Sequence, residues 1–175
     1  MRLYFIRHGE STSNYGELIT GQQDVPLTEH GEAQAKQAGQ DIAASGLKID
    51  LIVSSSLDRA HDTAEIIARE IGYPLDAIEI NDLVIERSFG SLEGKTKEET
   101  GFLDDTKVQE AGGELDAAIR ARADRFLESY RGKPGTLLVV SHTGFGRRLR
   151  AVVQEIPTDH SDNFKNAVLT NLGEI

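Results

Sequence analysis

Two histidines and two arginines follow short apolar runs of this sequence, at positions where a parallel sheet would bring them together. Arg7 and His8 follow the first run, His142 follows a later one, and Arg59 comes shortly after a third. Guanidinium groups bind phosphate oxygens bidentately, and imidazole is among the side chains that form covalent intermediates. The chain has no Cys and no Ser-His-Asp order, so imidazole is the best available nucleophile. This pattern favours a phosphoryl group carried by histidine, with arginine neutralising its oxygens.

Predicted strands and helices alternate along the chain, and they must position these side chains. Apolar runs predict three buried strands, at residues 2–7, 50–54 and 136–141. Helical spacing predicts four main helices, at residues 28–44, 60–71, 114–130 and 145–156. Buried strands that alternate with amphipathic helices indicate an α/β fold with three layers (α/β/α) and a mainly parallel central sheet flanked by helices. Ligands of such folds bind beyond the carboxyl ends of the strands, so the histidines and arginines are expected to converge there.

Other segments give weaker signals. Residues 78–86 are predicted to form a short, irregular strand region, and residues 167–170 a last strand. Residues 90–113 have many glycines and charges and no clear period, which predicts a loop-rich segment with room for a short helix. Ser55 and Asp58 are spaced to form a capping box at the start of the second helix.

The charge balance excludes several kinds of partner. The 175 residues include 19 Lys and Arg against 29 Asp and Glu, a net charge of −10. This argues against a nucleic-acid surface and against a polybasic membrane anchor. The apolar runs are much shorter than the about 20 residues of a membrane-spanning helix. We therefore expect a single cytoplasmic domain over residues 1–175, either monomer or homodimer, with no nucleic-acid or membrane partner.

Five short blocks of the sequence carry a family resemblance. The blocks are Arg7-His8-Gly9-Glu10-Ser11 with Asn14, Thr20-Gly21 with Pro26-Leu27-Thr28-Glu29-His30-Gly31, Ser54-Ser55-x-x-x-Arg59-Ala60 with Thr63-Ala64, Glu86-Arg87-x-Phe89-Gly90-x-x-Glu93-Gly94, and Ser141-His142-Thr143-Gly144. In this order and spacing, they resemble the histidine phosphatase superfamily in its phosphoglycerate mutase-like branch. The resemblance covers nearly the whole chain and implies an enzyme that acts on a small phosphorylated substrate.

The resemblance also implies residue roles. His8 is implied to be the nucleophile that becomes phosphohistidine, with Arg7, Arg59 and His142 as the rest of the phosphate pocket. Glu86 is implied to protonate the leaving group and then to activate water. The positions implied to line the substrate are Asn14, Thr20, Gly21 and Thr143. No metal or cofactor is implied, because the Arg and His cluster supplies the positive charge. Since His8 must attack as neutral imidazole, its other nitrogen is expected to donate to a backbone carbonyl.

Two departures from the family pattern bear on specificity. Thr143 stands where the family often has Gly or Ala, although its hydroxyl can donate to a ligand oxygen. Residues 95–113 are shorter and more acidic than in the mutases that resemble this chain, which favours a phosphatase over a mutase. A mutase and a non-catalytic phospho-ligand-binding module remain the alternatives. Asp82 and Glu93 are alternatives to Glu86 as the proton donor.

The remaining candidates have simpler interpretations. Gly9 and Gly144 are expected to let the backbone approach a ligand. A basic cluster on the last main helix is predicted to be a solvated face paired with acidic neighbours: Arg147, Arg148 and Arg150. Three further histidines are predicted to lie on the surface: His30, His61 and His160.

Overall fold

One sheet carries the strands that the sequence predicts, and most of them run in the same direction. The computed structural model describes residues 1–14 and 18–175. Within these residues the strands are β1 Arg2–Arg7, β2 Leu51–Ser54, β3 Glu79–Ile80, β4 Thr136–Ser141 and β5 Thr170–Glu174. Their order in the sheet is β3-β2-β4-β1-β5, with all neighbouring pairs parallel except β1 and β5.

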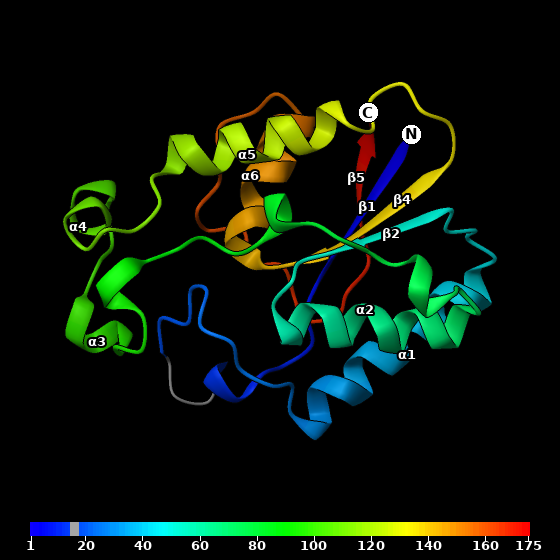
Figure 1. Ribbon diagram of the computed structural model, residues 1–175, viewed down its shortest axis with the longest axis horizontal. Helices are drawn as coiled ribbons and strands as arrows, with labels where there is room; N and C mark the ends of the chain where they lie inside the picture. The colour runs from blue at the N-terminus through cyan, green and yellow to red at the C-terminus, as the bar shows by residue number, and fades with distance from the viewer. Residues whose placement is uncertain (15–17) are drawn as a thin grey trace.

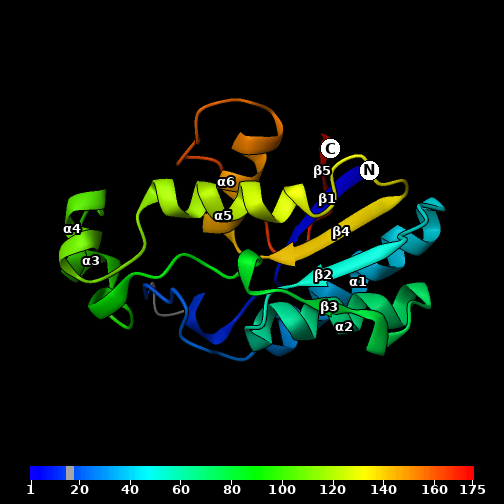
Figure 2. The ribbon, with the colours of Figure 1, turned by 45° about the horizontal axis from the view of Figure 1, so that its top comes forward.

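Helices cover both faces of this sheet (Figures 1 and 2). On one face lie α1 Glu29–Ser45 and α2 Asp58–Ile71, and on the other α5 Asp116–Glu128 and α6 Thr143–Val153. Two short helices, α3 Lys97–Thr100 and α4 Asp105–Glu110, lie to one side of the sheet, at the left of Figure 1. Shorter 3-10 turns occupy Thr12–Asn14, Leu75–Ala77, Asp82–Val84 and Gly90–Leu92. The three-layer fold with a mainly parallel sheet is therefore confirmed.

The alternation of side chains along β4 explains the two cores. All six residues of β4 are buried, because the strand lies in the middle of the sheet. Leu137 and Val139 pack into the core under α5 and α6, whereas Leu138 and Val140 pack into the core under α1 and α2. Opposite faces of one strand thus fill separate apolar layers, as period-two geometry requires.

The strand register brings the functional segments to one edge. Arg7 pairs with Ser141 between β1 and β4, and Ser54 pairs with Val140 between β2 and β4. The carboxyl ends of the three strands are therefore level, and the residues that follow them emerge side by side.

The first two helices are formed and joined as their sequences predict. Thr28 caps α1 by accepting the Gly31 N–H at 3.0 Å, and Gly46 ends the helix at φ 71°. Gly39 lies against α2, and a side chain there would overlap the Cβ of Glu70. The small residues on α1 therefore allow the close packing of α1 and α2 expected from its alanine-rich face.

Two local predictions are wrong. Leu57 is the N-cap of α2 and has no side-chain cap bond, because Ser55 contacts His142 instead of forming a capping box. The last strand is Thr170–Glu174 rather than residues 167–170. Ala167 has φ 50° and donates its N–H to the Arg7 carbonyl at 2.9 Å, which fixes it in a turn beside the end of β1.

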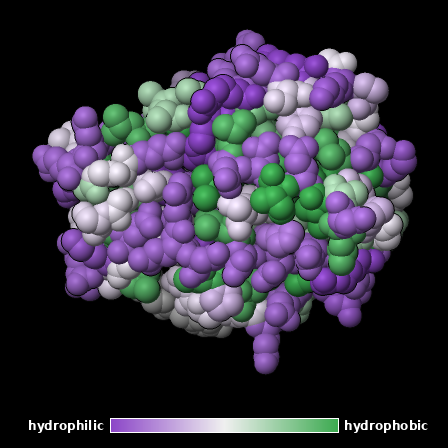
Figure 3. Space-filling view, in the orientation of Figure 1, coloured by the Kyte–Doolittle hydropathy of each residue, from purple (hydrophilic) through white to green (hydrophobic). Residues whose placement is uncertain are grey.

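The surface of this fold is mostly polar. The face drawn in Figure 3 is largely hydrophilic, with small groups of hydrophobic residues between the polar ones. Among the described residues, no helix has both the length and the apolar character needed to cross a membrane.

Candidate active site

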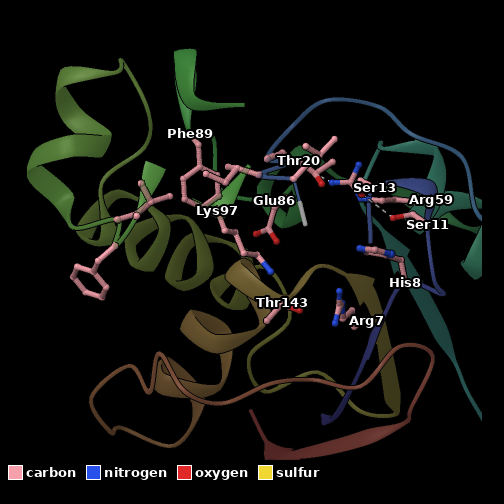
Figure 4. Close-up of a pocket in the computed structure, with 16 residues that line it drawn as sticks. Arg7, His8, Ser11, Ser13, Thr20, Arg59, Glu86, Phe89, Lys97 and Thr143 are labelled. Carbon is pink, nitrogen blue, oxygen red and sulfur yellow. Dashed lines mark hydrogen bonds between the residues drawn. The ribbon is translucent and has the colours of Figure 1, made fainter. Parts of the chain in front are cut away.

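A cavity of about 440 Å³ opens beyond the carboxyl ends of β1 and β2 (Figure 4). Most of the predicted site residues line it: Arg7, His8, Thr20, Gly21, Arg59, Glu86 and Thr143. His142 is fully buried, and its ring centre lies 5.2 Å from that of His8. The structure therefore brings together the residues that the sequence places after separate strands. The side chain of Asn14 lies outside the described part of the chain.

His8 is held as a neutral imidazole. Its Nδ1 lies 2.7 Å from the carbonyl oxygen of Gly9, so Nδ1–H donates there and Nε2 carries the lone pair. Burial, followed by the charges of Arg59 and Arg7, holds the pKa of His8 well below its usual 6.5. The backbone of His8 is fixed as well, because Asn166 Nδ2 donates to its carbonyl at 2.8 Å. The expected carbonyl partner of His8 is confirmed.

His142 is the more enclosed of the two histidines. Burial, followed by the charge of Arg59, also holds the pKa of His142 well below 6.5. Its Nε2 lies 2.8 Å from Ser55 Oγ, and its Nδ1 has no hydrogen-bond partner among the described residues. Arg7 Nε and Thr143 Oγ1 are also buried and lack a partner there. Buried polar groups are normally paired. The three unpaired atoms therefore indicate a site for a polar ligand rather than a part of the protein core.

The two arginines bring positive charge to the cavity and are anchored on backbone oxygens. Arg7 donates from Nη1 to the Phe164 carbonyl at 3.1 Å. Arg59 donates to the carbonyls of Gln23 and Gly21, each at 2.8 Å, and is 2% exposed. Burial lowers the pKa of both guanidinium groups, and the charge of Glu86 opposes that effect. An anionic ligand would relieve the cost of desolvating these cations.

Glu86 lies across the cavity from His8 and the two arginines (Figure 4). Its carboxylate accepts N–H bonds from Gly144 and Phe145 at the start of α6, each at 3.0 Å, and from Arg87 at 2.8 Å. A Cβ at position 144 would overlap Glu86 Oε1. Gly144 thus makes room for this carboxylate rather than for a ligand, which corrects our expectation for that glycine.

Gly9, the other glycine expected to let the backbone approach a ligand, also has a different structural role. A Cβ at Gly9 would overlap the carbonyl of Gly31, and one at Gly31 would overlap the carbonyl of Glu10. The two glycines let the loop after β1 lie directly against the first turn of α1. Gly9 therefore positions the loop that carries His8.

Neither alternative carboxylate lines the cavity. Asp82 accepts the hydroxyl proton of Ser56 at 2.6 Å. Glu93 Oε1 accepts the N–H groups of Phe89 at 2.9 Å and Gln22 at 3.2 Å. Both carboxylates hold loops together, which leaves Glu86 as the carboxylate in the cavity wall among the described residues.

Sequence reasoning missed Arg122, which holds the backbone that carries Glu86. Its guanidinium donates to the carbonyls of Leu83 at 2.7 Å and Ile85 at 2.9 Å, and pairs with both oxygens of Glu114 at 2.7 Å. Arg122 is 8% exposed and lies on the buried face of α5. An arginine on an otherwise apolar helix face is the signal that could have identified it.

Lys97 is a second residue that the sequence left unassigned. It lines the cavity, and Figure 4 shows its side chain reaching from α3 toward Glu86 and Thr143. The acidic segment 95–113 therefore brings a cation to the entrance of the site.

A second cavity, of about 600 Å³, adjoins the first and shares five lining residues with it: Glu86, Phe89, Phe102, Leu103 and Thr143. Arg148 lines it but is only 2% exposed, because it donates to Asp116 Oδ1 at 2.6 Å and to the Gly144 carbonyl at 3.0 Å. The prediction of a solvated face is wrong for this residue, since α6 turns it toward the start of α5.

The neighbours Arg147 and Arg150 are half-buried, and Arg148 and Arg150 each pair with an aspartate, as predicted for this cluster. Arg147 donates to the Asp162 carbonyl, and Arg150 pairs with the Asp162 carboxylate. His30 and His160 are exposed as predicted, whereas His61 is half-buried.

Comparisons with known proteins give the family of this chain. The sequence profile of the histidine phosphatase superfamily (branch 1) matches residues 3–173. A 2,3-bisphosphoglycerate-dependent phosphoglycerate mutase of Mesorhizobium japonicum is 34% identical over 169 residues, which cover 88% of this chain and 80% of that protein. The chain belongs to the histidine phosphatase superfamily, and the resemblance seen in the sequence is confirmed.

Solved structures with the same fold include phosphatases. A mycobacterial glucosyl-3-phosphoglycerate phosphatase in complex with VO3 matches with a TM-score of 0.78 and 25% identity, over 97% of this chain and 90% of that chain. A phosphoserine phosphatase mutant from Entamoeba histolytica in complex with phosphoserine matches with a TM-score of 0.81 and 25% identity, over 97% and 89%. The similar proteins thus include both a mutase and phosphatases.

Proposed function

We propose that this protein is a metal-independent phosphatase that hydrolyses small phosphomonoesters through a phosphohistidine on His8. The observation that carries the proposal is the pairing of a neutral, buried His8 with the Glu86 carboxylate across one cavity. Arg7 and Arg59 lie beside them and would neutralise the phosphoryl oxygens.

In the first step, His8 Nε2 attacks phosphorus and the bond from phosphorus to the ester oxygen breaks. The leaving oxygen takes a proton from Glu86 and departs as an alcohol. The Nδ1–H of His8 remains on the Gly9 carbonyl and stabilises the phosphorylated ring. Charge that develops on the phosphoryl oxygens is met by the two guanidinium groups.

In the second step, water attacks the phosphorus and the phosphorus–nitrogen bond breaks. Glu86 takes a proton from that water, so the products are inorganic phosphate and free enzyme. Three backbone N–H groups donate to this carboxylate and hold it in the cavity wall.

A phosphoglycerate mutase is the second candidate, favoured by the name of the Mesorhizobium relative. A mutase must retain a doubly charged intermediate and return the phosphoryl group to another hydroxyl. The segment beside the cavity offers Lys97 as a cation but also places Asp104 and Asp105 on the adjoining cavity. Asp105 is already paired with Arg87 at 2.7 Å. We favour hydrolysis because, among the described residues, Lys97 is the one cation that segment 95–113 brings to either cavity, while Asp104 adds a negative charge that opposes a second anionic group.

Turnover of p-nitrophenyl phosphate in EDTA, by wild type and by His8→Ala, tests the proposal. We expect turnover by the wild type and a loss of at least about a thousandfold in the variant, as for other nucleophile deletions. Binding of phosphate esters without turnover would instead support a phospho-ligand-binding module. Formation of 2-phosphoglycerate from 3-phosphoglycerate and a bisphosphate primer, faster than release of phosphate, would support the mutase.

A further inference from the structure

A buried serine hydroxyl contacts the second histidine of the site. Ser55 Oγ lies 2.8 Å from His142 Nε2, and both side chains are fully buried. Ser55 follows β2 and His142 follows β4, which are neighbours in the sheet. The contact is therefore set by the register of two parallel strands.

The surroundings of Ser55 decide where its hydroxyl proton goes. The Leu57 N–H donates to Ser55 Oγ at 3.3 Å, so this oxygen already accepts one hydrogen bond. If His142 Nε2 also carried a proton, Ser55 Oγ would accept twice, and its own buried O–H would have no acceptor among the described residues. Each group is satisfied when Ser55 donates to Nε2, and the ring proton then resides on Nδ1.

The other nitrogen of His142 has no partner among the described residues, and the ring centre lies 5.2 Å from that of His8. Burial, followed by the charge of Arg59, holds the pKa of His142 well below its usual 6.5, so the ring is neutral and has one proton. Nδ1 is buried and has no hydrogen-bond partner among the described residues. A protonated Nδ1 donates to an anion, whereas an unprotonated Nδ1 presents a lone pair that repels it.

We propose that Ser55 is a positioning residue that fixes His142 as the Nδ1–H tautomer, so that this N–H donates to an oxygen of the phosphoryl group at His8. The identity of the phosphoryl group rests on the proposed function. The tautomer does not, because the contacts that determine it lie within the protein.

Long-range ¹H–¹⁵N NMR of protein labelled with ¹⁵N-histidine tests the tautomer directly. The His142 signals are assigned by their loss in His142→Gln. We expect the Nδ1–H form in the wild type and the Nε2–H form in Ser55→Ala. A wild-type ring in the Nε2–H form would overturn the proposal, and that result needs no Ser55 variant to fold.

Ser54→Ala is the matched control. Ser54 is also fully buried, and its hydroxyl donates to the Ser55 carbonyl at 3.0 Å rather than to His142. We expect Ser54→Ala to keep the Nδ1–H form. The same tautomer change in both variants would show a general disturbance of the turn and would count against a specific role for Ser55.

Calorimetry with inorganic phosphate tests the donor role. We expect Ser55→Ala to weaken phosphate binding by about tenfold or more, the loss expected for one hydrogen bond to a charged group, and Ser55→Thr to restore it. Unchanged phosphate affinity in Ser55→Ala would overturn the donor role. Absence of turnover in a protein with the Nδ1–H tautomer and normal phosphate affinity would count against the proposed function alone.

Discussion

The residues at the strand ends and the segment 86–113 face the same cavity but are held in different ways. His8, Arg59 and His142 are buried. His8 and His142 come directly after β1 and β4, and Arg59 lies in the first turn of α2, which follows β2. The segment is more exposed and is fixed by side chains that bond to its backbone, such as Lys107 to the carbonyls of Thr100 and Phe102. We therefore propose that the strand ends carry the phosphoryl chemistry and that the segment selects the rest of the substrate.

Glu86 belongs to the segment by sequence but to the strand ends by its contacts. Its carboxylate bonds to the start of α6, directly after His142. Its backbone is held by Arg122 on α5 through the carbonyl of Ile85. The proposed proton donor is therefore tied to α5 and α6.

Of the proposed changes, Glu86→Gln should have the largest effect on activity. The amide cannot transfer a proton, so we expect kcat/KM for an alkyl phosphate to fall by about 10²–10⁴-fold. The loss should be smaller for p-nitrophenyl phosphate, because that leaving group needs little protonation. Steady-state kinetics with both esters measure the difference.

Glu93→Gln is the matched control for that change. Its amide oxygen can still accept the N–H groups of Phe89 and Gln22 that the carboxylate accepts now. We expect nearly normal kinetics with both esters. Equal losses in the two variants would place the proton donor elsewhere or reduce Glu86 to a structural role.

Arg122→Met should show that the backbone leading into Glu86 is held from α5. The change leaves the Glu114 carboxylate and the Leu83 and Ile85 carbonyls without their donor. We expect the free energy of unfolding to fall by about 3–5 kcal/mol, as when one partner of a buried pair is removed. Urea denaturation measures it.

Arg131→Met provides the exposed comparison. Its pair with Asp124 is 3.4 Å long, and both side chains are more than half exposed. Exposed pairs contribute little, so we expect almost no change in unfolding. A similar loss in both variants would contradict the claim that Arg122 has a special place in the fold.

Acid should lower the free energy of unfolding, because the two buried histidines at the strand ends are neutral in the folded protein. The pKa values of His8 and His142 in the folded protein lie well below the usual 6.5. As pH falls through 6.5, the unfolded chain binds protons that the folded chain does not, so the free energy of unfolding decreases. Above that pH, this contribution to stability is fully present.

This dependence is measured by the urea midpoint of unfolding at a series of pH values from about 8 to about 5, the range in which histidine side chains titrate. His142→Gln should reduce it, because one of the two buried neutral rings is then absent. An unchanged pH dependence in His142→Gln would mean that this ring is not kept neutral by folding.

The smallest effect should come from Phe102→Ala in the segment. Phe102 lines both cavities yet is 84% exposed. We expect unchanged unfolding and a KM for an aryl phosphate that rises by a few-fold, since one aromatic contact contributes about 0.5–1.5 kcal/mol. KM for a small polar ester should not change. Equal effects on both esters would remove the segment from substrate selection.

The residues that the sequence could identify are those whose signal is local. The strands that precede His8 and His142 are uninterrupted apolar runs, and the parallel fold then dictates that their ends meet. Thr28 and Gly46 are recognisable as helix ends because their bonds are made within a few residues.

The missed features depend on partners distant in sequence. Arg122 bonds to carbonyls 37 and 39 residues away, and nothing near it in sequence reveals them. Ser55 has the spacing of a capping residue, but a histidine 87 residues away contacts its hydroxyl instead. Ala167 lies in a turn because the Arg7 carbonyl accepts its N–H, an outcome that strand propensity cannot indicate.

The most direct test of the account is the site of covalent phosphorylation during turnover. Glu86→Gln with p-nitrophenyl phosphate should slow the second step more than the first, so that the phosphoenzyme accumulates. Peptide mass spectrometry after alkaline quenching should then find phosphate on His8, labile to acid and absent from His8→Ala. Phosphate on His142 or on a serine, or turnover in the wild type with no phosphoenzyme under any quench, would contradict the account.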